Sequence, residues 1–147
     1  MARNEHAIEI ARPPEAVFPY LTEPELLMQW VGGLTEFTPL DAHEAQPGAR
    51  SRQKMRVAGR DWTFGGEVLE LEPGRRIVVE IRGRGVEIRN AYALEEANGG
   101  TRLRVSVETT VSRLFARVLG SVVAREGQRK LEGDLARLKE LVEAEPS

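Results

Sequence analysis

Cysteine is absent from the 147-residue sequence. Its absence excludes disulfide bonds, thiolate catalysis, and zinc or iron–sulfur sites built on cysteine. Long hydrophobic runs are also absent, since no stretch approaches the roughly 18 consecutive apolar residues that a membrane-spanning helix needs. The N-terminal segment alternates polar and apolar residues and lacks the apolar core of a signal peptide. We therefore expect a cytoplasmic protein with no membrane insertion.

Neither sign of charge is in large excess. The sequence has 21 lysines and arginines against 23 aspartates and glutamates, a formal net charge of -2. Without a global basic field, nucleic acid is not an expected partner. The glycines of GRGVEIRN and FGGEV lack the strand-to-helix context of nucleotide-binding loops. No nucleotide or other cofactor is therefore predicted.

One acidic loop invites interpretation as a metal site. Asp41, His43 and Glu44 lie close together in DAHEAQPG, and carboxylates and imidazoles are common metal ligands. Their spacing defines no coordination geometry, however, and the composition is typical of a solvated connection. We predict a surface loop and no metal site.

The order of hydrophobic patterns predicts one α+β domain covering residues 1–147, a length that suits a single domain. Residues 6–10 alternate as a half-buried strand does. Pro14 and Pro24 stand where first-turn prolines begin helices, so two short helices are expected next. Strand-like segments then follow at residues 34–38, 51–58, 62–68, 77–82, 86–94 and 103–109.

The hydrophobic period changes in the last quarter of the chain. Residues 112–144 carry apolar side chains at helical spacing, which predicts one long helix or two in line. At about 1.5 Å per residue this segment reaches roughly 50 Å, enough to cross a curved sheet. Gly120, Gly127 and Gly133 lower helix stability. Each either allows close packing or bending, or is simply tolerated at the surface.

This order of elements resembles the START-like superfamily, also called SRPBCC, which includes polyketide cyclases, aromatase domains and the birch pollen allergen group. The resemblance covers nearly the whole chain and depends on the order of its segments. Those segments are IEIARPPEAVFPYLTEPELLMQW, GGLTEFTPL, PGARSRQKM, VLELEPGRRIVVEI, NGGTRLRV and LARLKELVE.

The resemblance implies a helix-grip fold. In that fold a curved antiparallel sheet of six or seven strands wraps around a long C-terminal helix, and two short helices follow strand one. An apolar cavity is then expected between the sheet and the C-terminal helix. Members of the superfamily bind lipids, sterols, polyketides or other hydrophobic molecules, and some catalyse cyclisation, dehydration or hydrolysis.

Ligand contacts are predicted for side chains on strand faces with apolar neighbours, and for one position on the long helix. Asn90 and Tyr92 stand at i and i+2 and therefore share a strand face. There an amide and a phenol could orient a ligand carbonyl or hydroxyl, unless Tyr92 only fills the core with its hydroxyl at the rim. The predicted ligand-binding residues are Gln53, Met55, Trp62, Phe64, Val79, Ile88, Asn90, Tyr92, Leu103, Val105 and Val122.

No inward-facing pair of acid and base is identified, so no catalytic residue is predicted. His6 and Thr109 share faces with apolar residues, and a structural role is favoured for His6 because no neighbouring acid in the sequence would fix its tautomer. Arg125, Glu126 and Arg129 are interpreted as a solvent-facing, salt-bridged stripe.

The first functional hypothesis is binding of a hydrophobic small molecule of lipid, polyketide or aromatic type. The alternatives are a cyclase- or dehydratase-type enzyme that uses the same cavity, and a protein-interaction module. The latter would present the arginine-rich strand face around Arg52 and Arg56 to an acidic partner. Monomer and homodimer both stay open.

Overall fold

The computed structural model describes residues 2–41, 45–57 and 59–146, and only the backbone of residues 114–121. Its strands form one antiparallel sheet in the order β1-β7-β6-β5-β4-β3-β2. The strands are β1 (Ala2–Ile10), β2 (Leu34–Pro39), β3 (Arg50–Val57), β4 (Arg60–Glu72), β5 (Arg76–Gly83), β6 (Val86–Ala97) and β7 (Gly100–Val111). The predicted antiparallel sheet is confirmed.

Prolines divide the segment after β1 into short helices. These are α1 (Pro14–Val17), α2 (Pro19–Thr22) and α3 (Pro24–Trp30), and each begins with a proline. A first-turn proline suits a helix start because its missing N–H would have no partner there. The first of the two predicted helices is thus divided at Pro19. The predicted long helix is α4 (Arg113–Ala144), which is continuous.

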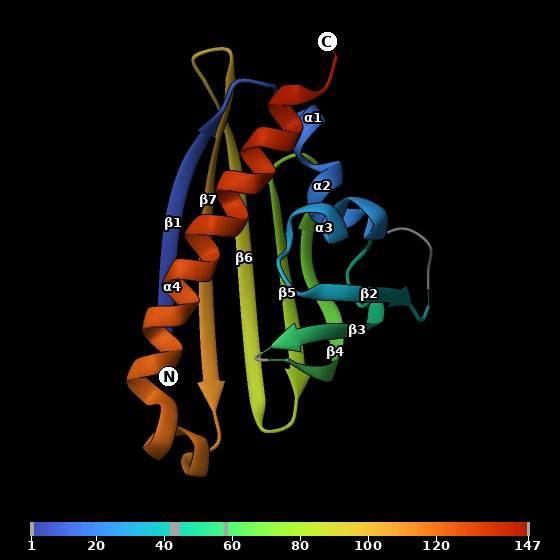
Figure 1. Cartoon of the computed structure of the whole chain (residues 1–147). Coiled ribbons are helices and arrows are strands. Elements are labelled where there is room, and N and C mark those ends of the chain that lie inside the picture. The colour runs from blue at the N-terminus through green and yellow to red at the C-terminus, as the bar shows by residue number, and fades with distance from the viewer. Residues whose placement is uncertain (1, 42–44, 58, 147) are drawn as a thin grey trace.

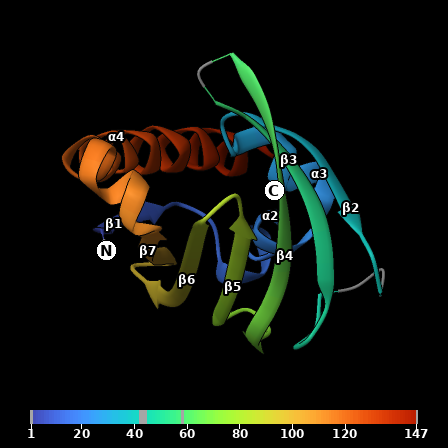
Figure 2. The same ribbon diagram turned by 90° about the horizontal axis from the view of Figure 1, so that it is seen from below.

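The helices lie on one side of the curved sheet. Figure 1 shows α4 running along β1 and β7, with α1–α3 beside its C-terminal half. Figure 2, seen from below, shows the sheet bending from β1 round to β2 so that α4 and α3 lie on its concave side. This is the predicted helix-grip arrangement, and it divides the concave face into a part under α4 and a part under the short helices.

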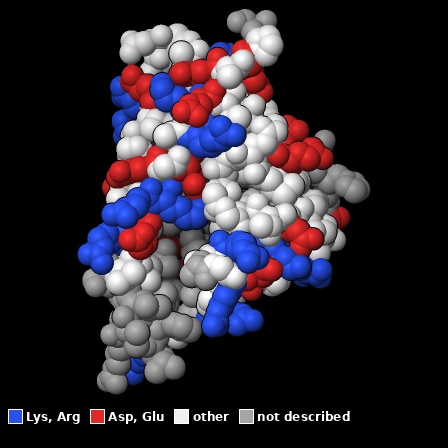
Figure 3. Space-filling view, in the orientation of Figure 1, with Lys and Arg blue, Asp and Glu red and all other residues white. Residues whose placement is uncertain are grey.

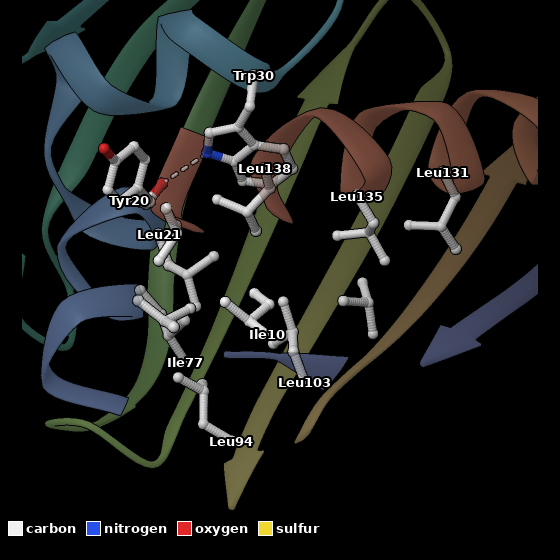
Figure 4. Close-up of a cluster of buried hydrophobic side chains, with 13 residues drawn as sticks. Ile10, Tyr20, Leu21, Trp30, Ile77, Leu94, Leu103, Leu131, Leu135 and Leu138 are labelled. Atoms are coloured by element: carbon white, nitrogen blue, oxygen red, sulfur yellow. Dashed lines mark hydrogen bonds between the residues drawn. The ribbon is translucent and has the colours of Figure 1, made fainter. Parts of the chain in front are cut away.

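The C-terminal half of α4 packs directly on the sheet. Leu135, Leu138 and Val142 are fully buried. They belong to the same cluster as Ile10 of β1 and Leu103 of β7, and Figure 4 shows the labelled leucines of α4 directed toward the strands. The space beneath this half of the helix is therefore filled by side chains.

Two contacts bring α4 close to β1. The buried Asn4 amide donates from Nδ2 to the Ala124 carbonyl at 2.9 Å and to Oε1 of Gln128 at 3.2 Å. A Cβ at Gly127 would stand 2.7 Å from Oδ1 of Asn4. Gly127 thus serves close packing, whereas a Cβ at Gly133 would meet nothing within 4 Å.

The outer edge of β1 is covered from α4. Gln128 donates to the Glu5 carbonyl at 3.0 Å, and the Lys139 ammonium donates to the Glu9 carbonyl. An uncovered edge strand offers unpaired backbone groups to other chains. These side chains occupy two of those groups, so α4 protects the edge as well as the core.

The end of α4 is attached to the first short helices. The Tyr20 hydroxyl donates to the Glu145 carboxylate at 2.5 Å, and Arg12 donates to the Glu145 carbonyl at 2.9 Å. Figure 4 also shows the indole N–H of Trp30 donating to the Tyr20 carbonyl, a bond of 2.8 Å. These bonds hold α2 and α3 against the C-terminal end of α4.

Candidate functional site

A cavity lies between the short helices and the inner face of β2–β6. It offers about 120 Å³ to the centres of water-sized molecules. Its described lining comes from α2, α3, the strands β2–β6 and the neighbouring loops, and includes no residue of α4. The sequence placed the cavity between the sheet and the C-terminal helix, and this placement is wrong for the described residues. The reason is that Leu131, Leu135 and Leu138 fill the space beneath the C-terminal half of α4.

Apolar side chains form most of the cavity wall. Leu21, Leu27 and Val31 cover it from the side of the short helices. On the sheet, alternate residues of a strand point to the same face, which brings Val68 of β4 and Val79 of β5 to this wall. Further apolar lining comes from Leu34, Phe37, Ile77 and Ile81.

A polar pair lies on the β3 side of the cavity. Gln53 and Ser51 are buried, and Nε2 of Gln53 donates to Oγ of Ser51 at 3.3 Å. Both side chains lie over Gly66 of β4, where a Cβ would stand 2.6 Å from Oγ of Ser51 and 2.8 Å from Nε2 of Gln53. Gly66 therefore leaves the space that the Gln53 carboxamide and the Ser51 hydroxyl occupy.

Asn90 and Tyr92 supply polar groups from β6. The ring of Tyr92 meets Trp30 edge to face, with 6.5 Å between ring centres. Burial, with a smaller contribution from the Asp134 carboxylate, raises the pKa of Tyr92, and a side-chain hydrogen bond with Asn90 opposes the shift. The phenol therefore stays protonated near neutral pH and has a proton to donate to a ligand.

Asp134 of α4 is a half-buried acid near Tyr92 that the sequence analysis missed. Its carboxylate accepts the Gly32 N–H at 3.1 Å and pairs with Lys130. A signal was present, because Asp134 stands three residues after Leu131 and four before Leu138, within the buried stripe of the helix.

One ion pair lies at the margin of the cavity. Arg50, a lining residue, donates from Nε and Nη2 to Asp41, both at 2.9 Å, and its backbone N–H donates to the same carboxylate at 3.1 Å. The side-chain hydrogen bonds lower the pKa of Asp41 and raise that of Arg50. Glu67, also a lining residue, stands opposite Arg50 on β4.

The structure separates the predicted ligand-binding residues into groups. Gln53, Val79, Asn90 and Tyr92 line the cavity. The other predicted residues are not among its described lining: Phe64, Leu103 and Val105 are buried, Met55, Trp62 and Ile88 are half-buried, and Val122 is 40% exposed.

Trp62 has a different environment from the one that the sequence suggested. The guanidinium of Arg84 lies 5.2 Å from its ring centre. Its indole nitrogen is buried and finds no hydrogen-bond partner among the described residues. The strand alternation placed Trp62 on the inner face but could not tell which part of that face borders a cavity.

The remaining candidates lie outside the cavity. Arg125, Glu126 and Arg129 are exposed on α4, while His6 and Thr109 are half-buried on their strands. The predicted loop residues His43 and Glu44 fall outside the described residues, as does Ala42 between them and Asp41.

No group of three or more His, Cys, Asp or Glu side chains is placed to hold a metal ion within residues 2–41, 45–57 and 59–146. Of the helices in the same ranges, none is both long and apolar enough to cross a membrane. Figure 3 shows acidic and basic side chains interspersed over one face of the molecule.

The chain belongs to the family described as polyketide cyclase / dehydrase and lipid transport, whose model matches residues 1–143. The resemblance to the START-like superfamily is thereby confirmed. No curated protein matches the sequence. The family covers both enzymes and carriers, so membership alone does not select an activity.

Solved structures share the fold at low sequence identity. Protein CV1439 from Chromobacterium violaceum is 22% identical, with a TM-score of 0.75 over 97% of this chain and 98% of its own. Ara h 8.0201 is 17% identical, with a TM-score of 0.76 over 97% and 98%. DynU16, a putative protein in the dynemicin biosynthetic locus, is 20% identical, with a TM-score of 0.73 over 98% of this chain and 48% of its own.

Proposed function

We propose that this protein binds a hydrophobic small molecule, of lipid, polyketide or aromatic type, in the cavity under α2 and α3. The supporting observation is a cavity with mostly apolar walls and a few polar side chains on three of its strands. Such a lining is typical of small-molecule sites, where apolar area provides affinity and polar groups fix orientation. The family description, which includes lipid transport, agrees with this function.

Filling the cavity tests the proposal. Val79 is half-buried in the cavity wall, so Val79→Phe places a ring in the ligand's space. Val57→Phe is the matched control, because Val57 is 49% exposed on β3 and lies outside the described lining. Naphthalene is the probe, and saturation-transfer NMR measures its binding.

We expect Val79→Phe to reduce naphthalene binding at least tenfold, while Val57→Phe leaves it unchanged. Circular dichroism and urea denaturation confirm that both variants are folded. Equal binding by wild type and a folded Val79→Phe variant would show that the probe binds elsewhere. Native mass spectrometry of the purified wild type adds a second measurement, in which a copurified apolar adduct is expected.

The alternative is a cyclase- or dehydratase-type enzyme. General acid–base catalysis needs a group whose pKa lies near the working pH. The pKa of Tyr92 moves away from neutrality, because burial raises it, and this weighs against Tyr92 as a base. We therefore propose binding as the first function and keep the enzyme as the alternative.

The interaction-module hypothesis draws less support from the charges of β3. Arg56 pairs with Asp61 at 3.1 Å, and the neighbouring Lys54 pairs with Glu36 at 3.1 Å, while Arg52, the other arginine of the hypothesis, is exposed. These neighbours offset much of the positive charge that would attract an acidic partner. The cavity remains the stronger basis for a function.

A further inference from the structure

We propose that the ligand is an uncharged ring compound of roughly ten to fifteen non-hydrogen atoms with one carbonyl, amide or hydroxyl group, and that the cavity selects against its anionic analogues. This inference rests on the proposed binding function. Three properties of the cavity carry it: its size, the chemistry of its polar groups and the charge around its margin.

The size of the cavity favours a small ring system over a long-chain lipid. One water needs about 10–15 Å³ of such space and occupies about 30 Å³ of liquid. The 120 Å³ of this cavity therefore hold on the order of ten waters. That volume is below the range of about 300–1,000 Å³ that ligand sites typically span. A two-ring compound fits, whereas a diacyl lipid does not.

The polar groups are suited to an uncharged partner. Gln53 on β3 and Asn90 on β6 both line the cavity, and each carboxamide offers N–H donors and a carbonyl acceptor. Gln53 uses Nε2 to donate to Ser51, and this bond fixes the amide without occupying its oxygen. The protonated hydroxyl of Tyr92 adds one further donor. Together these groups match a ligand amide, carbonyl or hydroxyl.

The charges around the cavity disfavour an anion. Arg50 is the cation of the described lining, and two of its guanidinium nitrogens already donate to Asp41. Glu67 lines the same margin, so these three groups sum to one negative charge. A ligand carboxylate would lose its hydration here without gaining an uncommitted cation, which is costly in an apolar site.

Three probes with the same ring system separate these effects. They are naphthalene, 2-naphthamide and 2-naphthoate, and isothermal titration or saturation-transfer NMR at pH 7 gives their affinities. We expect 2-naphthamide to bind at least tenfold more tightly than 2-naphthoate. Because the amide and the carboxylate have nearly the same shape, their difference reports charge.

Variants then assign the selectivity to residues. Gln53→Leu and Asn90→Leu should each weaken 2-naphthamide about five- to tenfold and leave naphthalene within about twofold. The matched control is Gln29→Leu, since Gln29 is exposed on α3 outside the described lining. Glu67→Gln changes an exposed side chain, so folding should be unaffected. It should strengthen 2-naphthoate about two- to fivefold without changing 2-naphthamide.

The outcomes distinguish the inference from the function on which it rests. If none of the three probes binds, the proposed binding function fails. If naphthalene binds but 2-naphthoate binds as tightly as 2-naphthamide, only the inference about ligand class is overturned. Unchanged 2-naphthamide affinity in both folded carboxamide variants would overturn it as well.

Discussion

Because α4 lies close to β1 at Gly127, we predict that Gly127→Ala changes the free energy of unfolding in a direction that depends on Asn4. Replacing glycine by alanine inside a helix is intrinsically stabilising by about 0.8–1.0 kcal/mol. A Cβ at Gly133 meets no atom within 4 Å. Gly133→Ala should therefore raise the free energy of unfolding by about this amount.

At Gly127 the same gain is opposed by displacement of Asn4. The new Cβ would stand 2.7 Å from Oδ1 of Asn4, so the amide must move away from its bonds to Ala124 and Gln128. Each neutral hydrogen bond contributes about 0.5–1.5 kcal/mol net. Losing both outweighs the helix propensity, so Gly127→Ala should lower the free energy of unfolding by about 1 kcal/mol.

A double-mutant cycle measures this coupling. In the Asn4→Ala background the obstruction is gone, and Gly127→Ala should stabilise the protein by about 1 kcal/mol, as Gly133→Ala does in the wild type. Urea denaturation of the single and double variants gives the free energies, with unchanged m values as the check on two-state unfolding. The reasoning is refuted if Gly127→Ala stabilises the wild type as much as Gly133→Ala does.

Three further predictions concern the core, the pH dependence and the cavity. Leu135 is fully buried, so Leu135→Ala should lower the free energy of unfolding by about 2–5 kcal/mol in urea denaturation; a loss below about 1 kcal/mol would contradict its place in the core. Burial, supported by the hydrogen bond to Glu145, raises the pKa of Tyr20 from 10.0 to about 12. Since the folded state holds this proton more tightly, the associated stability is present below about pH 10 and lost toward pH 12; Tyr20→Phe should show a smaller loss over that range, and identical pH profiles would count against the bond. Gly66→Ala would push the Gln53 and Ser51 side chains aside, so it should weaken 2-naphthamide severalfold in the same titrations while naphthalene binding stays nearly constant.

Much of the fold follows from local patterns. The sequence Asn98–Gly99 predicts a tight hairpin, and both residues have the positive φ that such a turn requires, at 53° and 80°. Pro14 and Pro24 begin helices as expected. These features depend on backbone stereochemistry within a few residues, which is why the sequence is sufficient to predict them.

The candidate site was only partly predictable. Gln53, Val79, Asn90 and Tyr92 line the cavity, because alternation along a strand fixes which side chains face inward. The same alternation also selects Leu103 and Val105, which are buried in the core instead. Strand periodicity identifies a face but cannot tell which stretch of that face another element covers.

The sequence by itself determined the order of the elements, the inward face of each strand and the near balance of 21 basic and 23 acidic residues. Only the tertiary structure decided that α4 fills the concave face beside β1 and β7, and that the open volume lies under α2 and α3. The position of this open volume depends on how deeply Leu131, Leu135 and Leu138 reach toward the sheet. That depth is set by packing between segments more than a hundred residues apart, such as Asn4 and Ala124, and no local pattern encodes it.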